Sequence, residues 1–219
     1  VNQSAGGALH VRGGRSNEVG YFIDGVSVSN PFFTNSLAVS VSNKALEEMK
    51  LVSGAFNAEY GNAMSGVVNV KIKDGGKDYD GSISYYTGDY SSDDDQLFPN
   101  ISEQSLTANR TFDAFVSGPI LPALGDKLTF NVSLRQSNSE GYLFGVREHR
   151  PSDFAYFPPN GNWYIQMSGD SSYVPMNPSE SSNFLSKITW RLSPTIKIST
   201  QSILSRSQSK SYSHAYKYN

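Results

Sequence analysis

The sequence predicts a mostly β protein, in which a mixed α/β piece is followed by antiparallel strands of a large transmembrane β-barrel that is incomplete in this chain. Two observations lead to this prediction. Five segments after residue 77 alternate apolar and polar residues, the period of two that places successive side chains on opposite faces of a strand. The connections between these segments alternate between short and long, as in barrels with turns at one end and external loops at the other.

The five alternating segments have about the 9–11 residues that a tilted membrane strand needs. In the clearest one, Leu128 to Leu134 carries apolar residues at even positions and polar residues at odd positions. Because barrels with a filled lumen have about 22 strands, five strands cannot enclose a domain, so we interpret the sequence as a segment of a longer wall. The segments are 81–90, 109–118, 127–138, 184–192 and 195–207, joined by short links at 119–126 and 193–194 and by long links near 91–108 and 139–183.

Residues 1–76 have a different pattern, with short strands expected at 9–12, 20–28 and 66–73. Asp24-Gly25 is a hairpin signal, because both positions of a type I′ turn require positive φ. Asn43 is a plausible N-cap, so the sequence predicts a helix over 44–49 with acidic residues early in it. Asp74 to Lys77 is expected to link this piece to the strands.

Composition excludes several classes of protein. The net charge of −2 gives no electrostatic reason to expect nucleic acid as a partner, and the absence of cysteine excludes disulfides and thiolate metal sites. Charged residues make up 17%, below the ~25% usual for soluble domains, while aromatic residues make up 12%. No apolar run approaches the ~20 residues of a membrane helix. Low charge with many aromatic residues suits strands that have one wet and one apolar face.

Two motifs then carry a resemblance to a family. Residues 11–26 read VRGGRSNEVGYFIDGV, followed by Asn30-Pro31-Phe32; residues 46–54 read LEEMKLVSG and lead into EYGNAMSGVVNV at 59–70. In this order and spacing they resemble the plug domain of TonB-dependent outer-membrane receptors, of a Bacteroidetes-like kind. The resemblance covers residues 1–76 by motif, as the later part of a plug domain, and residues 77–219 only by strand pattern, as the first strands and loops of the barrel.

The resemblance implies a function and a location. It implies active uptake of a scarce nutrient, such as a siderophore, an oligosaccharide, cobalamin or a peptide, across the bacterial outer membrane. The expected partners are TonB, acting through an N-terminal segment absent here, the nutrient itself and outer-membrane lipid. Some Bacteroidetes-like receptors also pair with a surface lipoprotein lid. The family implies no enzymatic activity and no cofactor.

Arg12 and Arg15 flank the two glycines of the first motif. An arginine-glycine segment can bind RNA, but this one occurs once in a chain of negative net charge. A turn whose arginines meet nearby carboxylates is the plainer interpretation. The family resemblance implies that plug arginines pair with acidic groups of the barrel wall, and we expect this role for Arg12 and Arg15.

Candidate substrate contacts come from two loops. Asn30, Phe32 and Phe33 follow the Asp24-Gly25 hairpin, where the resemblance implies a plug loop exposed to substrate. The long link at 139–183 is rich in aromatic residues, among them Tyr156, Trp163 and Tyr164, whose ring faces suit sugars, aromatic ligands and peptides. The same rings could instead pack the loop on itself or form an interfacial girdle.

No catalytic or metal site is expected. The three histidines, His10, His149 and His214, lie far apart and have no metal-ligand spacing, and the acidic run at 93–95 lacks EF-hand spacing. Two other classes of function remain open. A receptor-like barrel could be a component of an outer-membrane complex for export or surface assembly. A soluble all-β module could bind carbohydrate, and it would fold without a membrane.

Overall fold

The computed structural model describes residues 2–3, 9–11, 13–29, 41–53, 64–103, 105–159 and 161–212. These residues form mostly β structure with short 3-10 helices, which confirms the predicted mostly β class. They fall into two compact units. The first unit contains Val1–Ser84, Phe112–Gln136 and Ser182–Arg206. The second unit contains Tyr85–Thr111, Ser137–Ser181 and Ser207–Asn219. No helix of the described residues is long and apolar enough to cross a membrane.

A four-stranded N-terminal sheet has the order β4-β3-β6-β5. β3 (Val19–Ile23) turns into β4 (Val26–Ser27) through Asp24 and Gly25, whose φ values of 47° and 85° match the predicted hairpin turn. β6 (Gly66–Ile72) pairs parallel to β3 and antiparallel to β5 (Leu46–Val52). Asn2–Gln3 (β1) pairs with Leu9–His10 (β2), and Ser16–Glu18 forms the short 3-10 helix η1 before β3.

β-Branched residues build the core of this sheet. Pleated strands favour such residues, because their stiff side chains pack well on the half-buried surface. Leu185, from a strand far along the chain, packs into the same cluster. Its buried members are Val11, Val19, Ile23, Val68, Val70, Ile72 and Leu185.

The predicted helix over 44–49 is wrong. Residues 46–52 form strand β5 instead, with Met49 opposite Val70 and Leu51 opposite Val68 in the antiparallel ladder with β6. Helix propensities differ by less than ~1 kcal/mol per residue for ordinary side chains, so the ladder of hydrogen bonds with β6 outweighs them. The acidic residues that suggested a helix start pair with lysines instead, Glu47 with Lys71 across the strands.

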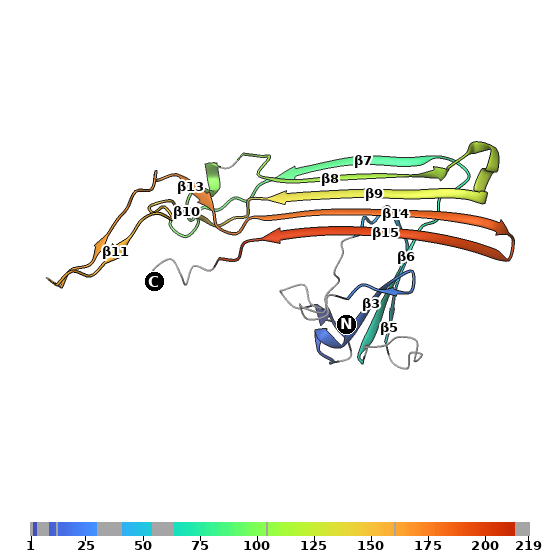
Figure 1. Cartoon of the computed structure of the whole chain (residues 1–219), viewed down its shortest axis with the longest axis horizontal. Helices are drawn as coiled ribbons and strands as arrows, with labels where there is room; N and C mark the ends of the chain where they lie inside the picture. Colours follow the sequence, from blue (N-terminus) through green and yellow to red (C-terminus); the bar gives the residue numbers. More distant parts are fainter. Residues whose placement is uncertain are drawn as a thin grey trace. The chain divides into compact units, whose positions relative to one another are not determined.

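The second sheet contains the five strands that the alternation predicted. Its order is β15-β14-β9-β8-β7, so most strands lie beside their neighbours in sequence, and their directions alternate across the sheet (Figure 1). β14 begins five residues before the predicted segment at 184, where polar residues hide the alternation. The strands are β7 (Asp80–Gly88), β8 (Asn109–Pro119), β9 (Leu128–Ser139), β14 (Ser179–Ser193) and β15 (Ile196–Ser209). They do not close into a barrel.

Burial along these strands is opposite to that of a soluble protein. Thr129 and Asn131 are fully buried, whereas Ile188 and Trp190 are 46% and 49% exposed. Water-soluble folds bury apolar side chains and leave polar ones exposed. A membrane barrel has the converse pattern, because its outer face meets lipid and its inner face is polar.

The long connections carry small ribbons of their own. β10 (Phe144–Val146) pairs antiparallel with β13 (Tyr173–Pro175), and β11 (Ala155–Tyr156) pairs antiparallel with β12 (Tyr164–Ile165). Ile101–Glu103 forms the 3-10 helix η2 in the β7–β8 connection, and Pro122–Lys127 forms η3 in the short β8–β9 link. The 139–183 connection is therefore built around two antiparallel ribbons rather than being an unstructured loop.

Candidate functional site

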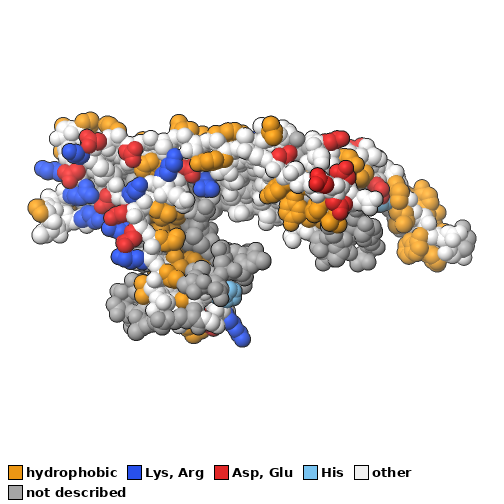
Figure 2. All heavy atoms as spheres, turned by 180° about the vertical axis from the view of Figure 1, so that it is seen from behind, with side chains coloured by type: hydrophobic (Ala, Val, Ile, Leu, Met, Phe, Trp, Pro, Cys, Tyr) orange, Lys and Arg blue, Asp and Glu red, His pale blue; other side chains and the backbone are white. Residues whose placement is uncertain are grey.

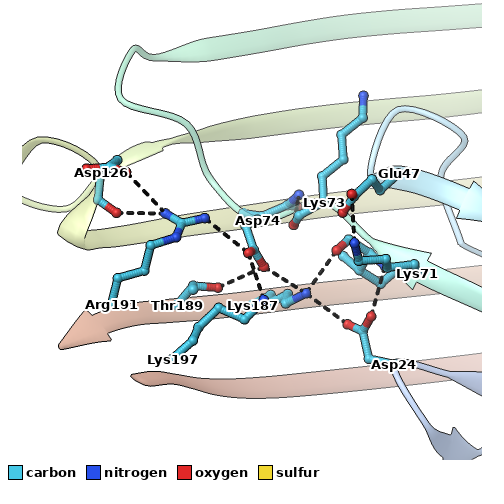
Figure 3. A network of polar contacts seen from close by, with 12 residues as sticks. Asp24, Glu47, Lys71, Lys73, Asp74, Asp126, Lys187, Thr189, Arg191 and Lys197 are labelled. Atoms are coloured by element: carbon cyan, nitrogen blue, oxygen red, sulfur yellow. Dashed lines mark hydrogen bonds and ion pairs between the residues drawn. The ribbon is translucent and has the colours of Figure 1, made fainter. Parts of the chain in front are cut away.

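The N-terminal sheet contacts the buried face of the five-stranded sheet through a charged cluster, which we define as Asp24, Asp74, Lys187, Arg191 and Lys197 (Figure 3). Lys187 lies at its centre. Its side chain is only 5% exposed, and its ammonium lies 3.0 Å from Asp24 Oδ2 and 3.0 Å from Asp74 Oδ1. It also donates to the carbonyl of Ile72 at 2.9 Å. A buried cation requires such partners, because desolvation without them is very costly.

Asp74 is the most heavily contacted carboxylate of the cluster. Besides Lys187, it accepts hydrogen bonds from Arg191 at 3.2 Å, Lys197 at 3.1 Å and the Thr189 hydroxyl at 3.1 Å. Burial by itself would raise the pKa of Asp74, but the hydrogen bonds from Lys187 and Lys197 outweigh it and lower the pKa to about 2. Asp74 is therefore ionised across the physiological pH range.

Strand geometry explains why these residues meet. β3 and β6 are parallel, with Ile23 opposite Val70, so Asp24 and Asp74 both lie just beyond the same end of the sheet. The Ile72 amide donates to Asp24 at 3.2 Å and fixes this carboxylate. On β14 the alternation places Lys187, Thr189 and Arg191 on one face. Figure 2 shows Lys and Arg side chains gathered, with acidic ones among them, at the end of the sheet that carries the short links.

A second set of contacts joins the same two elements. Ser42 donates its hydroxyl to the buried carboxylate of Asp113 on β8 at 3.0 Å, and Arg135 of β9 lies 3.5 Å from Asp113. Lys44 donates to Ser84 on β7 at 2.9 Å. Asn131 donates its amide to the carbonyl of Lys73 at 2.9 Å. Polar contacts of this kind therefore extend from β7 to β15.

Not every buried polar atom between the N-terminal sheet and the five-stranded sheet has a hydrogen-bond partner among the described residues. Thr129 Oγ1 and Asn131 Oδ1 are buried without a hydrogen-bond partner among the described residues. Each unpaired buried polar atom costs about 1–3 kcal/mol. The contact between the N-terminal sheet and the five-stranded sheet therefore combines charged and polar pairs with two unpaired buried oxygens.

Some predicted site residues lie elsewhere or outside the description. Arg15 is exposed, and its backbone amide, rather than its guanidinium, bonds to Glu18 at 3.1 Å. Its guanidinium has no ion pair within the described residues, so the pairing expected for Arg15 stays a prediction. Arg12, Asn30, Phe32 and Phe33 lie outside the described residues.

Sequence reasoning did not single out the charged cluster. The alternation places Lys187 on the polar face of its strand, and Asp24 is evident as a turn residue. Neither signal indicates that the two meet. Here the acidic groups lie at the end of the N-terminal sheet and the basic groups on the five-stranded sheet, the reverse of the arrangement expected for Arg12 and Arg15.

The aromatic candidates lie on the β11–β12 hairpin of the second unit. Tyr156 and Tyr164 are opposite each other in the ladder, with ring centroids 5.4 Å apart, and Phe154 adds a third ring 5.7 Å from Tyr164. On the other face Phe157 and Trp163 are 5.2 Å apart. These rings are about half exposed or more, and hydrophobic side chains cover the hairpin in Figure 2.

Hydrogen bonds fix the base of this hairpin. Asp153 accepts from the Ser168 hydroxyl, from the Ser168 amide at 2.9 Å and from the Arg150 amide at 3.0 Å. The two bonds from Ser168, followed by that from Arg150, lower the pKa of Asp153. His149 Nδ1 lies 2.9 Å from the carbonyl of Gln166, so this histidine has a structural partner. The aromatic rings are thus carried on a defined support.

No metal-binding group of three or more His, Asp or Glu side chains occurs within the described ranges. His10 Nδ1 lies 3.2 Å from the carbonyl of Gly14, and His214 lies outside the description. The candidate functional features are therefore two separate ones, a charged contact within the first unit and an exposed aromatic hairpin within the second.

A sheet with a buried polar face and an exposed apolar face, which holds a small domain through ion pairs, has the pattern expected of a segment of a membrane barrel. Residues 2–67 match the family described as TonB-dependent Receptor Plug Domain. The chain is also 28% identical over 129 residues, 56% of its length, to the TonB-dependent transporter Oar of Myxococcus xanthus. The chain spans 12% of that relative.

Two solved structures are also similar. One is a mutant of the ferric enterobactin receptor PfeA from Pseudomonas aeruginosa. The match covers 89% of this chain and 26% of the PfeA chain, with 14% sequence identity and a TM-score of 0.49. The other is the outer membrane transporter YddB from Escherichia coli. The match covers 86% of this chain and 25% of the YddB chain, with 18% sequence identity and a TM-score of 0.48.

The resemblance to TonB-dependent outer-membrane receptors is thus confirmed, and so is the location in the bacterial outer membrane. This location also disfavours the soluble carbohydrate-binding module. Receptors and transporters of this family are not enzymes. From here on we call the N-terminal sheet and its connections the plug, and the five-stranded sheet the wall.

Proposed function

We propose that the protein takes up a scarce nutrient across the outer membrane in a TonB-dependent manner. In this proposal residues 1–76 are the later part of the plug, and residues 77–219 are the first strands and loops of the barrel. The plug motifs support the assignment. The observation that carries the proposal is the charged cluster, in which the buried Lys187 of the wall joins the Asp24 turn to the Asp74 end of the plug.

The charges of the cluster explain how one contact can keep the plug in place and still allow the plug to move. Lys187, Arg191 and Lys197 oppose Asp24 and Asp74, so the closed state is held by attraction between opposite charges at about 3 Å. When the plug moves, water can solvate each of these groups, so separation replaces ion pairs by hydration rather than leaving buried charges bare. A mechanical pull on the plug then has to overcome a short-range contact only.

The external end is proposed to capture the nutrient. The hairpin rings Tyr156, Trp163 and Tyr164 offer apolar faces with hydroxyl and indole N–H donors, chemistry that suits a siderophore, an oligosaccharide, cobalamin or a peptide. Asn30, Phe32 and Phe33 are proposed to contact the nutrient from the plug, and Arg12 and Arg15 to pair with carboxylates of the wall. TonB is the proposed energy-coupling partner, with outer-membrane lipid around the barrel and a surface lipoprotein as a lid.

Uptake is tested in the bacterium that makes the protein. A strain lacking the gene is grown under limitation for iron chelates, cobalamin, oligosaccharide or peptide in turn, beside the parent strain and a strain lacking TonB. We expect a growth defect on one nutrient that the TonB-deficient strain shares and that the cloned gene restores. Normal growth on every nutrient, together with loss of another surface protein, would contradict uptake and support a role in a surface complex.

Plug movement is tested by cross-linking, which the absence of cysteine in these 219 residues makes simple. Ser42→Cys with Asp113→Cys places two thiols where a direct hydrogen bond now joins plug and wall. A short bifunctional thiol reagent should then abolish uptake, and a reducible reagent should allow its recovery. Ser205→Cys with Asn183→Cys is the matched control, because that pair joins two wall strands and should leave uptake unchanged.

A further inference from the structure

A pocket of about 390 Å³ lies within the second compact unit, at one end of strands β8, β9, β14 and β15. Its volume is within the ~300–1,000 Å³ range of small-molecule pockets, which are usually lined by apolar and aromatic side chains. This pocket contains no aromatic residue, and most of its lining is Ser, Thr, Asn, Gln or charged. The lining therefore indicates a polar or charged ligand.

Four charged residues of the lining belong to four neighbouring strands. Arg110 is in β8 and Glu180 is in β14, while Glu140 and Lys210 directly follow β9 and β15. The sheet order is β15-β14-β9-β8, so the two carboxylates come from the central pair of strands and the two cations from the strands on either side. Hydrogen bonds from the Glu140 and Lys210 amides to the carbonyls just before β8 and β14, at 3.2 and 2.9 Å, keep these strand ends together.

The head groups of these four residues are available to a ligand. All four residues are exposed, and within the described ranges no ion pair or side-chain hydrogen bond engages their head groups. The two carboxylates would repel a simple anion, and Arg110 and Lys210 would repel a simple cation. An uncharged ligand would remove water from four charged groups without supplying an opposite charge, which is unfavourable. The arrangement therefore favours a ligand that carries one positive and one negative group.

We propose that this pocket binds a short peptide with free termini, whose carboxylate lies on Arg110 and whose ammonium lies on Glu180. The guanidinium fork of arginine binds a carboxylate through two parallel hydrogen bonds. β8 and β14 are two strand spacings apart, about 10 Å, which is also about the length of an extended tripeptide. The hydroxyl and amide side chains of the lining supply donors and acceptors for the peptide groups between the termini. This inference rests on the proposed uptake and names peptide as the class of nutrient.

The test uses the full-length receptor purified in detergent and a pool of tripeptides of Gly, Ala, Ser and Asn, whose retention is measured by mass spectrometry. The pool is offered with free termini, N-acetylated or C-amidated. We expect each blocked pool to bind the parent about tenfold more weakly, the effect of losing one hydrogen bond to a charged group. Arg110→Gln should bind the amidated pool as well as the free one, and Glu180→Gln the acetylated pool as well as the free one. Arg206→Gln and Glu103→Gln are the matched controls, exposed residues outside the lining, and should keep the preference for free termini.

The peptide assignment is overturned if the parent retains no free tripeptide or retains the blocked pools equally well. It is also overturned if a neutral oligosaccharide, or glycerophosphoethanolamine with the same two charges on a lipid head group, binds more tightly than the peptides. Folded Arg110→Gln and Glu180→Gln receptors that keep the parent's preference would likewise overturn it; heat-modifiable migration on a gel verifies folding.

Growth separates this inference from the proposed uptake. If the receptor binds the free tripeptides but a strain lacking the gene grows normally on them, the site is correct and uptake is contradicted. If that strain fails on another nutrient and the receptor retains no peptide, uptake is supported and the peptide assignment is wrong.

Discussion

Replacing Lys187 by methionine removes the buried ammonium of the charged cluster while keeping a side chain of similar length. Losing one partner of a fully buried ion pair costs about 3–5 kcal/mol, because the remaining charge stays buried. Asp24 and Asp74 are 21% and 18% exposed, so water relieves part of this penalty. Asp74 also keeps Arg191 and Lys197 as partners. We therefore expect the closed plug to lose about 2–3 kcal/mol.

Hydrogen exchange of the full-length receptor in detergent measures this loss. Amides of β6 should exchange about 30- to 150-fold faster in Lys187→Met, since each 1.4 kcal/mol is a factor of ten. Lys197→Met is the matched control: Lys197 contacts the same Asp74 but is 47% exposed, so about 0–1 kcal/mol is expected. Equal exchange of β6 in Lys187→Met and the parent would refute the view that this cluster holds the plug.

Three further predictions concern the plug–wall contact and the hairpin. Asp74 lies in the link outside the spanning strands, and its pKa is lowered to about 2, so its ionised form stabilises the closed plug by about 1–2 kcal/mol after solvent screening. This stabilisation is complete above pH ~4 and is lost as the pH falls toward 2, so hydrogen exchange of the β6 amides should accelerate over that interval. An exchange rate that does not change with pH in this interval would contradict the role of Asp74. Gly75→Ala should destabilise the plug–wall contact by about 1–3 kcal/mol, because the new Cβ would clash with the backbone oxygen of Phe130 on β9. Gly76→Ala should be nearly neutral, because the nearest atom to its new Cβ lies at 3.7 Å. Equal melting temperatures for the two variants would show that the close approach at Gly75 is absent. The double variant Tyr156→Ala with Tyr164→Ala should change the free energy of unfolding by no more than about 0.5 kcal/mol, because both rings are exposed. It should nevertheless abolish growth on the limiting nutrient. Normal growth would exclude these rings from substrate capture.

The sequence by itself determined the wall. Each of the five strands was evident from alternation, because a side-chain period of two is a local property that does not depend on the neighbouring strand. The Asp24-Gly25 turn was evident for a similar reason, since few residues adopt positive φ. The strand at 46–52 was missed because its acidic start favours a helix locally, while the ladder with β6 that decides its conformation is formed by residues about twenty positions away.

Only the tertiary structure decided which charges meet. Asp24, Asp74 and Lys187 span more than 160 positions of the sequence, and each looks like an ordinary turn, linker or strand residue. The parallel pairing of β3 with β6 brings the two carboxylates to one end of the plug, and burial of one face of β14 selects Lys187 as their partner. An ion pair depends on distance in space, and local sequence patterns carry no information about the distance between elements far apart in the chain.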